Sequence, residues 1–212
     1  MSRVIICLLL FGLSQPAQAL ISQPTVEAEA TAPRQATVLW DVPTEASENG
    51  DKVVSSWELG LADNFSFSGV DTYTYAADKL SAELTREHGL RSIDQYYVRV
   101  RALYADGTTS NYGSTYFYTM IGKIKNLRVD HSTSGTTTLK WEKPAREGDT
   151  LTYNVRLYRK EKLVFEDSVY GKSNITVTGL KVDKRYNFKV RGRNDSKYGI
   201  GKWSDKKYFR EQ

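Results

Sequence analysis

The residues best suited to chemistry in this sequence are cations that alternate with apolar side chains near the C-terminus. Between Tyr186 and Arg193, every second position from Lys189 onward is basic: Lys189, Arg191 and Arg193. In an extended strand these three side chains project from one face, because successive side chains point to opposite sides. Trp203 follows ten residues after Arg193. Lys and Arg favour binding of anions through their charge, and Trp can hold such cations in place through cation–π contacts.

A second basic row has the same alternation. Arg156, Tyr158 and Lys160 stand at every second position, and they alternate with the apolar row Tyr153, Val155 and Leu157. If the apolar residues point into a core, the basic and aromatic residues point outward. The pattern therefore predicts a strand with one buried face and one basic face.

The sequence has few residues suited to catalysis or to metal binding. The sequence has two histidines, His88 and His131, and one cysteine, Cys7, and none of them has the spacing of a metal ligand or a nucleophile–base pair. No Gly-rich phosphate loop is present. We therefore expect no catalytic residues, no metal site and no cofactor, and we interpret the protein as a non-enzyme.

The first nineteen residues read as a signal peptide. Arg3 precedes an apolar run from Val4 to Leu13, and Ala17-Gln18-Ala19 offers a small-x-small cleavage site. The run is too short for a membrane span, which needs roughly 20 apolar residues, and no longer apolar run follows. The sequence predicts export, with no membrane span and no cysteine in the mature chain.

Beyond residue 19 the hydrophobic pattern has a period of two, which is typical of strands, and turn residues separate the segments. In the first half the pattern predicts strands at 24–30, 35–42, 53–62, 67–76, 81–87, 95–105 and 112–120. In the second half it predicts strands at 124–130, 135–142, 151–159, 163–169, 174–178, 184–193 and 203–210. The chain is therefore expected to be all-β.

The two halves repeat one another. Trp40 recurs as Trp141, and the Leu90 to Ala102 segment recurs as the Leu180 to Gly192 segment, with leucine, tyrosine and alternating apolar residues at matching places. We expect two tandem domains, at 20–121 and 122–212. Residues 120–123 would form a very short linker, which predicts a restricted angle between the domains.

At these residues the chain resembles the fibronectin type III family. The resemblance rests on Trp40 and Trp141, each followed by a proline three residues later, and on the leucine-to-tyrosine segments that end at Tyr96 and Tyr186. It covers residues 24–210. It implies two seven-stranded, immunoglobulin-like β-sandwiches, with both tryptophans in the cores and both tyrosines bonding back to a connecting loop. The first repeat is longer between its third strand and Leu90, so strand placement at 63–80 is the least defined.

In a type III sandwich the third and sixth strands are neighbours in one sheet, so the resemblance places the two basic rows side by side. We expect a basic, partly aromatic binding surface made of Arg156, Tyr158, Lys160, Lys189, Arg191, Arg193, Lys202 and Trp203. Stacking of Arg191 or Arg193 on Trp203 would stabilise it. Trp203-Ser204 also resembles half of the Trp-Ser-x-Trp-Ser motif of cytokine receptors, but the cysteines of that family are absent.

Two other interpretations of this surface stay open: a solvated sheet face with edge-protecting lysines, or a docking face for the first domain or for another copy of it. Residues 20–121 carry 7 Lys and Arg against 14 Asp and Glu, whereas residues 122–212 carry 22 against 11. Opposite charges of this size would also support self-association.

The sequence thus favours a secreted, non-enzymatic binding or adhesion protein that recognises a protein or an anionic polysaccharide through loops or the basic sheet. We do not expect a nucleic acid partner. The alternatives are a structural subunit of an extracellular fibre or appendage, and an accessory module of a polysaccharide-active enzyme.

Overall fold

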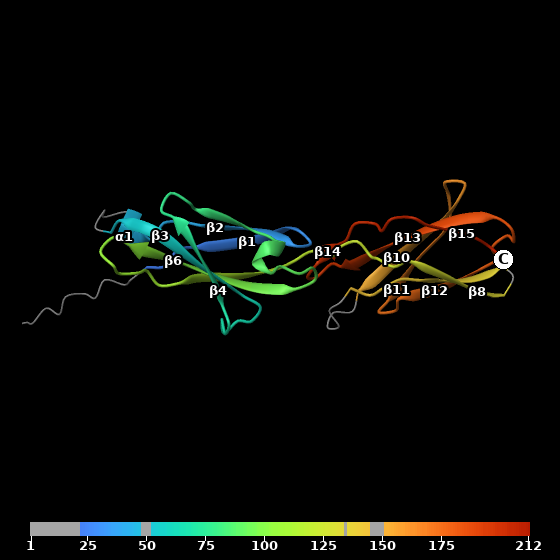
Figure 1. Cartoon of the computed structure of the whole chain (residues 1–212), viewed down its shortest axis with the longest axis horizontal. Coiled ribbons are helices and arrows are strands. Elements are labelled where there is room, and N and C mark those ends of the chain that lie inside the picture. Colours follow the sequence, from blue (N-terminus) through green and yellow to red (C-terminus); the bar gives the residue numbers. More distant parts are fainter. Residues whose placement is uncertain (1–21, 48–51, 134, 145–150) are drawn as a thin grey trace, which may run out of the picture.

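The computed structural model describes residues 22–47, 52–133, 135–144 and 151–212. The expected signal peptide, 1–19, lies outside the described residues, as does Cys7. Two β-sandwiches follow one another along the long axis of the molecule (Figure 1). The all-β prediction is confirmed; within the described ranges the strands are accompanied by a short α-helix, α1 (Thr44–Ser47), and a 3-10 turn, η1 (Arg86–His88).

The first sandwich consists of two antiparallel sheets. One has the strand order β1-β2-β5 and the other the order β4-β3-β6-β7. The strands are β1 (Val26–Ala32), β2 (Gln35–Trp40), β3 (Val54–Ala62), β4 (Asp71–Ala76), β5 (Ser81–Leu84), β6 (Gln95–Tyr104) and β7 (Gly113–Tyr118).

The second sandwich repeats this arrangement. One sheet has the order β12-β9-β8, and the other has the order β11-β10-β13-β14, with β15 also paired to β13. The strands are β8 (Arg128–Thr133), β9 (Thr136–Lys140), β10 (Thr152–Arg159), β11 (Lys162–Tyr170), β12 (Asn174–Thr178), β13 (Arg185–Asn194), β14 (Gly199–Ile200) and β15 (Lys207–Arg210).

Three predicted strands begin four residues later than expected, and one strand was not expected. The strand predicted at 67–76 begins at Asp71, because Phe67 and Gly69 adopt positive φ angles of 53° and 66°, which end an extended run. The strands predicted at 124–130 and 203–210 begin at Arg128 and Lys207. The two-residue strand β14 had no sequence signal, since so short a segment has no period to recognise.

Each sandwich has its own core around the predicted tryptophan. Trp40 is 5% exposed and packs on Trp57 with ring centroids 6.0 Å apart, and Trp141 is 2% exposed and packs on Tyr153 at 5.4 Å. Burial of such large apolar side chains stabilises a fold by about 25 cal/mol per Å² of area removed from water. The core positions of Trp40 and Trp141 are as expected.

Both predicted tyrosine corners are present. The Tyr96 hydroxyl accepts a hydrogen bond from the Arg91 amide at 2.9 Å and donates one to the Gly89 carbonyl at 3.1 Å. The Tyr186 hydroxyl accepts from the Lys181 amide at 2.9 Å. These bonds tie the start of β6 and of β13 to the loop that precedes it.

Candidate functional site

Trp203 is placed beside strand β13 by the residue that follows it. The Ser204 amide donates to the Val190 carbonyl at 2.8 Å, and the Val190 amide donates to the Ser204 hydroxyl at 3.0 Å. Ser204 is only 6% exposed, so this pair of bonds is shielded from water. The clamp holds the indole of Trp203 over the outer side of the sheet.

Three cations surround this indole. The distances to the ring centroid are 4.6 Å for the Arg191 guanidinium, 4.8 Å for that of Arg156 and 4.9 Å for the Lys189 ammonium. Arg156 on β10 lies directly opposite Lys189 on β13 in the register. Lys189 also lies 5.3 Å from the ring of Tyr158. We call these five residues the Trp203 face: Arg156, Tyr158, Lys189, Arg191 and Trp203.

The charges of the Trp203 face are only partly compensated. Arg156 forms an ion pair with Glu166, with 2.6 Å between Nε and Oε1, and this hydrogen bond raises the pKa of the Arg156 guanidinium. Within the described part of the chain, neither Lys189 nor Arg191 has a carboxylate at ion-pair distance. The Nε atom of Arg191 is buried without a hydrogen-bond partner. Two positive charges therefore remain open to an outside anion.

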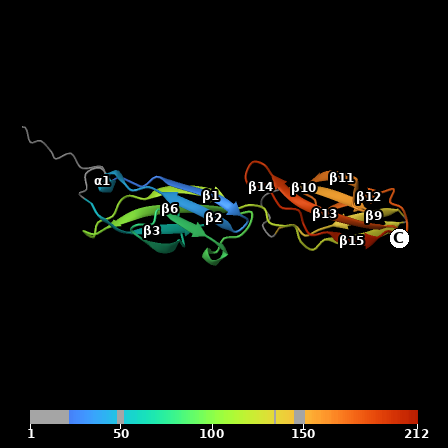
Figure 2. The ribbon, with the colours of Figure 1, turned by 90° about the horizontal axis from the view of Figure 1, so that it is seen from above.

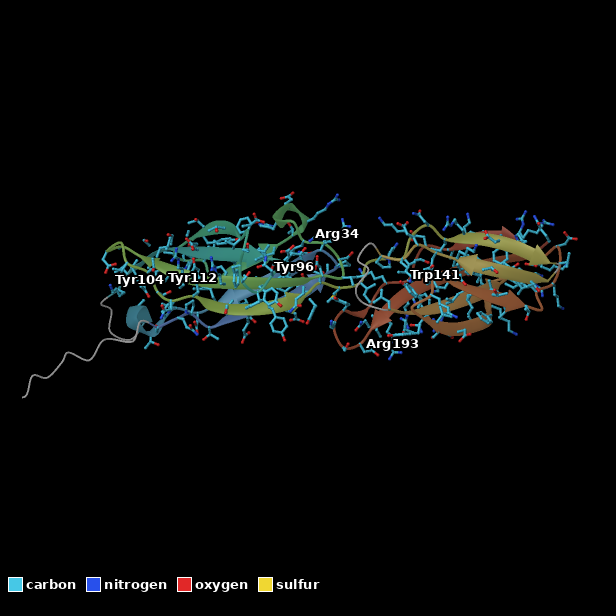
Figure 3. The ribbon with its side chains drawn as sticks, turned by 90° about the horizontal axis from the view of Figure 1, so that it is seen from below. Arg34, Tyr96, Tyr104, Tyr112, Trp141 and Arg193 are labelled. Carbon is cyan, nitrogen blue, oxygen red and sulfur yellow. The ribbon has the colours of Figure 1, made fainter. Side chains whose placement is uncertain are left out.

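The other three residues expected at this site, all within the described ranges, make no cation–π contact with the Trp203 ring. Arg193 bonds to both carboxylate oxygens of Asp195, at 2.8 and 2.7 Å, and this bond raises the pKa of Arg193 and lowers that of Asp195. It lies at the end of the second sandwich nearest the first (Figure 3). Lys160 occupies the turn after β10, with a φ of 47°, and Lys202 is exposed beside Trp203. Of the two stackings expected on Trp203, only that of Arg191 is observed.

Two residues near the Trp203 face, Glu166 and Asn187, have contacts or burial that the sequence pattern does not predict. Glu166 meets Arg156 because β11 pairs antiparallel with β10, and that register is not visible in the alternation of either strand alone. Asn187 belongs to the outward register of β13, but it is 5% exposed. Its partners in the register are Tyr158 and Tyr208, one on each side.

A similar group of side chains lies on the matching sheet of the first domain, and the sequence analysis missed it. The guanidiniums of Arg99 and Arg101 lie 4.3 and 4.7 Å from the ring centroid of Tyr112. Glu58 closes this group: its Oε1 lies 3.0 Å from Arg101 Nε, and the Tyr112 hydroxyl donates to the same carboxylate. We call these four residues the Tyr112 face: Glu58, Arg99, Arg101 and Tyr112.

The environment of Glu58 keeps it charged. Burial raises its pKa, but hydrogen bonds from Tyr112 and Arg101, together with the charges of Arg101 and Arg99, outweigh burial and lower the pKa below its ordinary value. Burial and the bond to Glu58 raise the pKa of the Tyr112 hydroxyl. The Tyr112 face therefore supplies its own counter-charge.

The histidines have structural contacts. The ring of His88 accepts a hydrogen bond from the Thr85 amide at 3.0 Å and closes a capping box on η1. His131 lies 3.1 Å from the Thr137 hydroxyl, within strand β8. Both side chains are half-buried, His88 in the turn η1 and His131 in strand β8. Among the described residues no group of three or more His, Cys, Asp or Glu side chains could hold a metal ion.

Comparison with known proteins identifies one family and many similar solved structures, of which two are given below. Residues 122–209 match the model of the fibronectin type III domain. A two-domain fibronectin type III segment of chicken tenascin has a TM-score of 0.55 and 15% identity, over 88% of this chain and 98% of that one. The FN1–FN3 segment of chicken CNTN1 has a TM-score of 0.38 and 16% identity, over 90% of this chain and 67% of that one.

Proposed function

Because this chain has the fold of two tandem fibronectin type III domains, we propose that it is a secreted, non-enzymatic binding or adhesion protein that holds an anionic partner on its Trp203 face. Domains of this family commonly mediate binding. The observation that carries the proposal is the pair Lys189 and Arg191, which the indole of Trp203 holds in place and which no carboxylate of the described residues neutralises.

Neighbouring like charges make this face an unfavourable surface for the free protein. Lys189 and Arg191 lie on one side of the same strand, and Arg156 lies across from Lys189. Like charges on adjacent strands destabilise a sheet by a few tenths to about 1 kcal/mol, and a cation–π contact at an exposed site returns about 0.5–1 kcal/mol. A bound anion would remove the repulsion without requiring new side-chain ordering.

The wider charge distribution supports the same partner. Residues 122–212 carry 22 Lys and Arg against 11 Asp and Glu. A surface of one sign raises the local concentration of partners of the opposite sign and speeds their association. The partner we propose is therefore an anionic glycan or the acidic surface of a protein.

Export is part of the proposal and rests on residues 1–19 and on the absence of cysteine after Cys7. Among the described residues no helix is long and apolar enough to cross a membrane. We place the mature first domain at 20–121 and the second at 122–212. Intact-mass measurement of exported protein should show an N-terminus at or near Leu20, whereas a chain beginning at Met1 would contradict export by cleavage.

Retention of the full chain on heparin-agarose tests the Trp203 face. The variant K189S/R191S should elute at lower salt, and the slope of log affinity against log salt should fall by roughly one for each cation lost. The matched control is K160S/R193S, which removes the same formal charge from residues outside the face. Equal elution of the two double variants would show that only total charge matters and would contradict the proposal.

A second column separates the two kinds of partner. Immobilised poly-glutamate presents carboxylates on a polypeptide, whereas heparin presents sulfates on a sugar chain. If only heparin retains the wild type in a K189- and R191-dependent way, the partner is an anionic glycan; if poly-glutamate does so at equal salt, it is an acidic protein surface.

A further inference from the structure

A residue in an unfavourable backbone conformation lies where the two domains meet. Ile93, in the loop between η1 and β6, has a φ of 60°. The left-handed region is unfavourable for any residue with a Cβ atom, and most of all for a β-branched one. Ile93 is nevertheless buried, at 3% exposure. A conformation of this kind persists only where its surroundings enforce it.

Buried polar contacts fix the loop that carries Ile93. The Asp94 amide donates to the Thr119 hydroxyl at 2.9 Å, and that hydroxyl lies 2.6 Å from the Arg91 carbonyl, to which it donates. The Thr119 amide donates to the Asp94 carbonyl at 2.9 Å. Asp94 and Thr119 are 1% and 0% exposed. The loop is thereby bonded to the residue two positions before Ile121.

The side chain of Ile93 packs with the second domain although it belongs to a loop of the first. It lies outside the hydrophobic cluster around Trp40 and inside the cluster around Trp141, together with Ile121, Ile124 and Tyr198. Burial of this side chain offsets the unfavourable backbone.

On the opposite side, the second domain makes room for Ile121. A Cβ atom added to Gly192 would come within 3.0 Å of Ile121 Cγ2, and one added to Gly201 within 2.9 Å of the same atom. The Gly201 amide donates to the Gly192 carbonyl at 3.0 Å, which aligns the two glycines. The repeat has Ala102 where the second domain has Gly192. The second domain thus departs from the repeat at the point where Ile121 needs the space.

A ring contact adds a further link across the junction. The rings of Tyr118, the last residue of β7, and Tyr198 meet edge to face, with centroids 5.6 Å apart. The Lys197 ammonium lies 5.8 Å from the Tyr118 ring centroid. Strand β14, which follows Tyr198, lies at the end of the second sandwich next to the first (Figure 2).

We propose that residues 91–94 form an interdomain lock, in which Ile93 and Ile121 together hold the second domain at one fixed angle to the first. The angle then comes from packing of the loop and the linker onto the second domain, and not from linker length alone. The lock presents the Trp203 face in a set direction relative to the first domain, and it does not depend on which partner that face binds.

Distance measurement between two spin labels tests the lock in the full chain. Cysteines replace the exposed residues Asp78 and Lys172, one in each domain, and Cys7 is changed to serine. The wild-type background should give one narrow distance peak. Ile93→Gly should lose it, because glycine accepts the same φ but removes the side chain. Lys160→Gly, at another positive φ of 47° in an exposed turn, is the matched control and should keep the peak.

Two further variants make the test decisive. Gly201→Ala should shift or broaden the peak, because the new methyl group displaces Ile121. Thr119→Val removes the hydroxyl that bonds to the loop at nearly constant volume, and it should broaden the peak even if Ile93→Gly fails to fold. Circular dichroism checks that each variant is folded. A single narrow peak at the wild-type distance in folded Ile93→Gly, or in Thr119→Val, would overturn the lock.

Discussion

Each domain carries a group of cations and an aromatic ring on the equivalent sheet of its sandwich. Only the group of the first domain includes a carboxylate, that of Glu58. On the Tyr112 face, Glu58 lies directly opposite Arg101 and bonds to it. On the Trp203 face, Asn154 lies directly opposite Arg191 at the matching place. The residue type at this one register position thus decides whether the arginine opposite it, Arg101 or Arg191, has a carboxylate partner.

The amide of Asn154 does not replace the missing carboxylate. Its Nδ2 donates to the Ser168 hydroxyl on β11 at 2.7 Å, so it is directed toward the edge strand. The only acid bonded to the Trp203 face among the described residues is Glu166, which is paired with Arg156. In both domains the sheet brings cations and a ring together, and the residue across the strand pair decides whether one of the arginines has a carboxylate partner.

The largest expected effect is the loss of stability when the core tryptophan that both domains share is removed. Trp40→Ala and Trp141→Ala should each lower the free energy of unfolding of their own domain by about 3–5 kcal/mol, because each removes a large buried ring. Trp203→Ala should cost much less, since Trp203 is only half-buried. Urea unfolding followed by domain-resolved NMR measures all three. A wild-type transition in either core variant would contradict the shared core.

The next largest effect comes from adding or removing the carboxylate opposite the arginine, the feature in which the two domains differ. Asn154→Glu should compensate Arg191, lower the salt needed for elution from heparin and reduce the salt slope by roughly one. Glu58→Gln should open the Tyr112 face and move elution in the other direction. The control is Asn154→Gln, which keeps the position uncharged. If Asn154→Glu and Asn154→Gln elute together, the residue opposite Arg191 does not set binding.

A smaller effect distinguishes the tyrosine corners. Tyr96 makes two hydrogen bonds with its loop, to Arg91 and Gly89, whereas Tyr186 accepts one from Lys181. Tyr96→Phe should destabilise the first domain by about 1 kcal/mol or slightly more, and Tyr186→Phe should cost the second domain somewhat less. Thermal unfolding of each variant gives the comparison, and a larger loss for Tyr186→Phe would reverse it.

The smallest effect is the contribution of Glu58 to the pH dependence of the first domain's stability. The folded state lowers the pKa of Glu58 from its ordinary value of 4.5. A carboxyl of this kind stabilises the fold fully above 4.5, and the stabilisation is lost as the pH falls through the lowered pKa. In Glu58→Gln, the free energy of unfolding of the first domain should therefore fall less steeply as the pH is lowered, as measured by urea unfolding at a series of pH values. An unchanged pH profile in that variant would show that Glu58 adds no net stability.

Much of the fold follows from local pattern. Alternation of apolar and polar residues predicts strands such as β3, β10 and β13 almost to the residue, because a strand with one buried face must repeat every second position. Trp40 and Trp141 identify the cores, since a chain with a single cysteine can form no disulfide of its own and needs large apolar side chains to hold two sandwiches together. Loops such as 63–70 were misjudged because positive φ angles at Phe67 and Gly69 leave no period in the sequence.

The sequence by itself thus determined the all-β class, the repeat, and the outward row of cations on β10 and β13, because all three depend on spacing within one segment. Only the tertiary structure decided which cations keep a counter-charge, because Glu58 and Glu166 reach their arginines across strand pairs whose register no single strand encodes. The tertiary structure also explains two residues at the junction of the domains. Gly192 stands where the first repeat has alanine because Ile121 occupies the space of a Cβ atom, and Ile93 is apolar because it packs in the same cluster as Ile121.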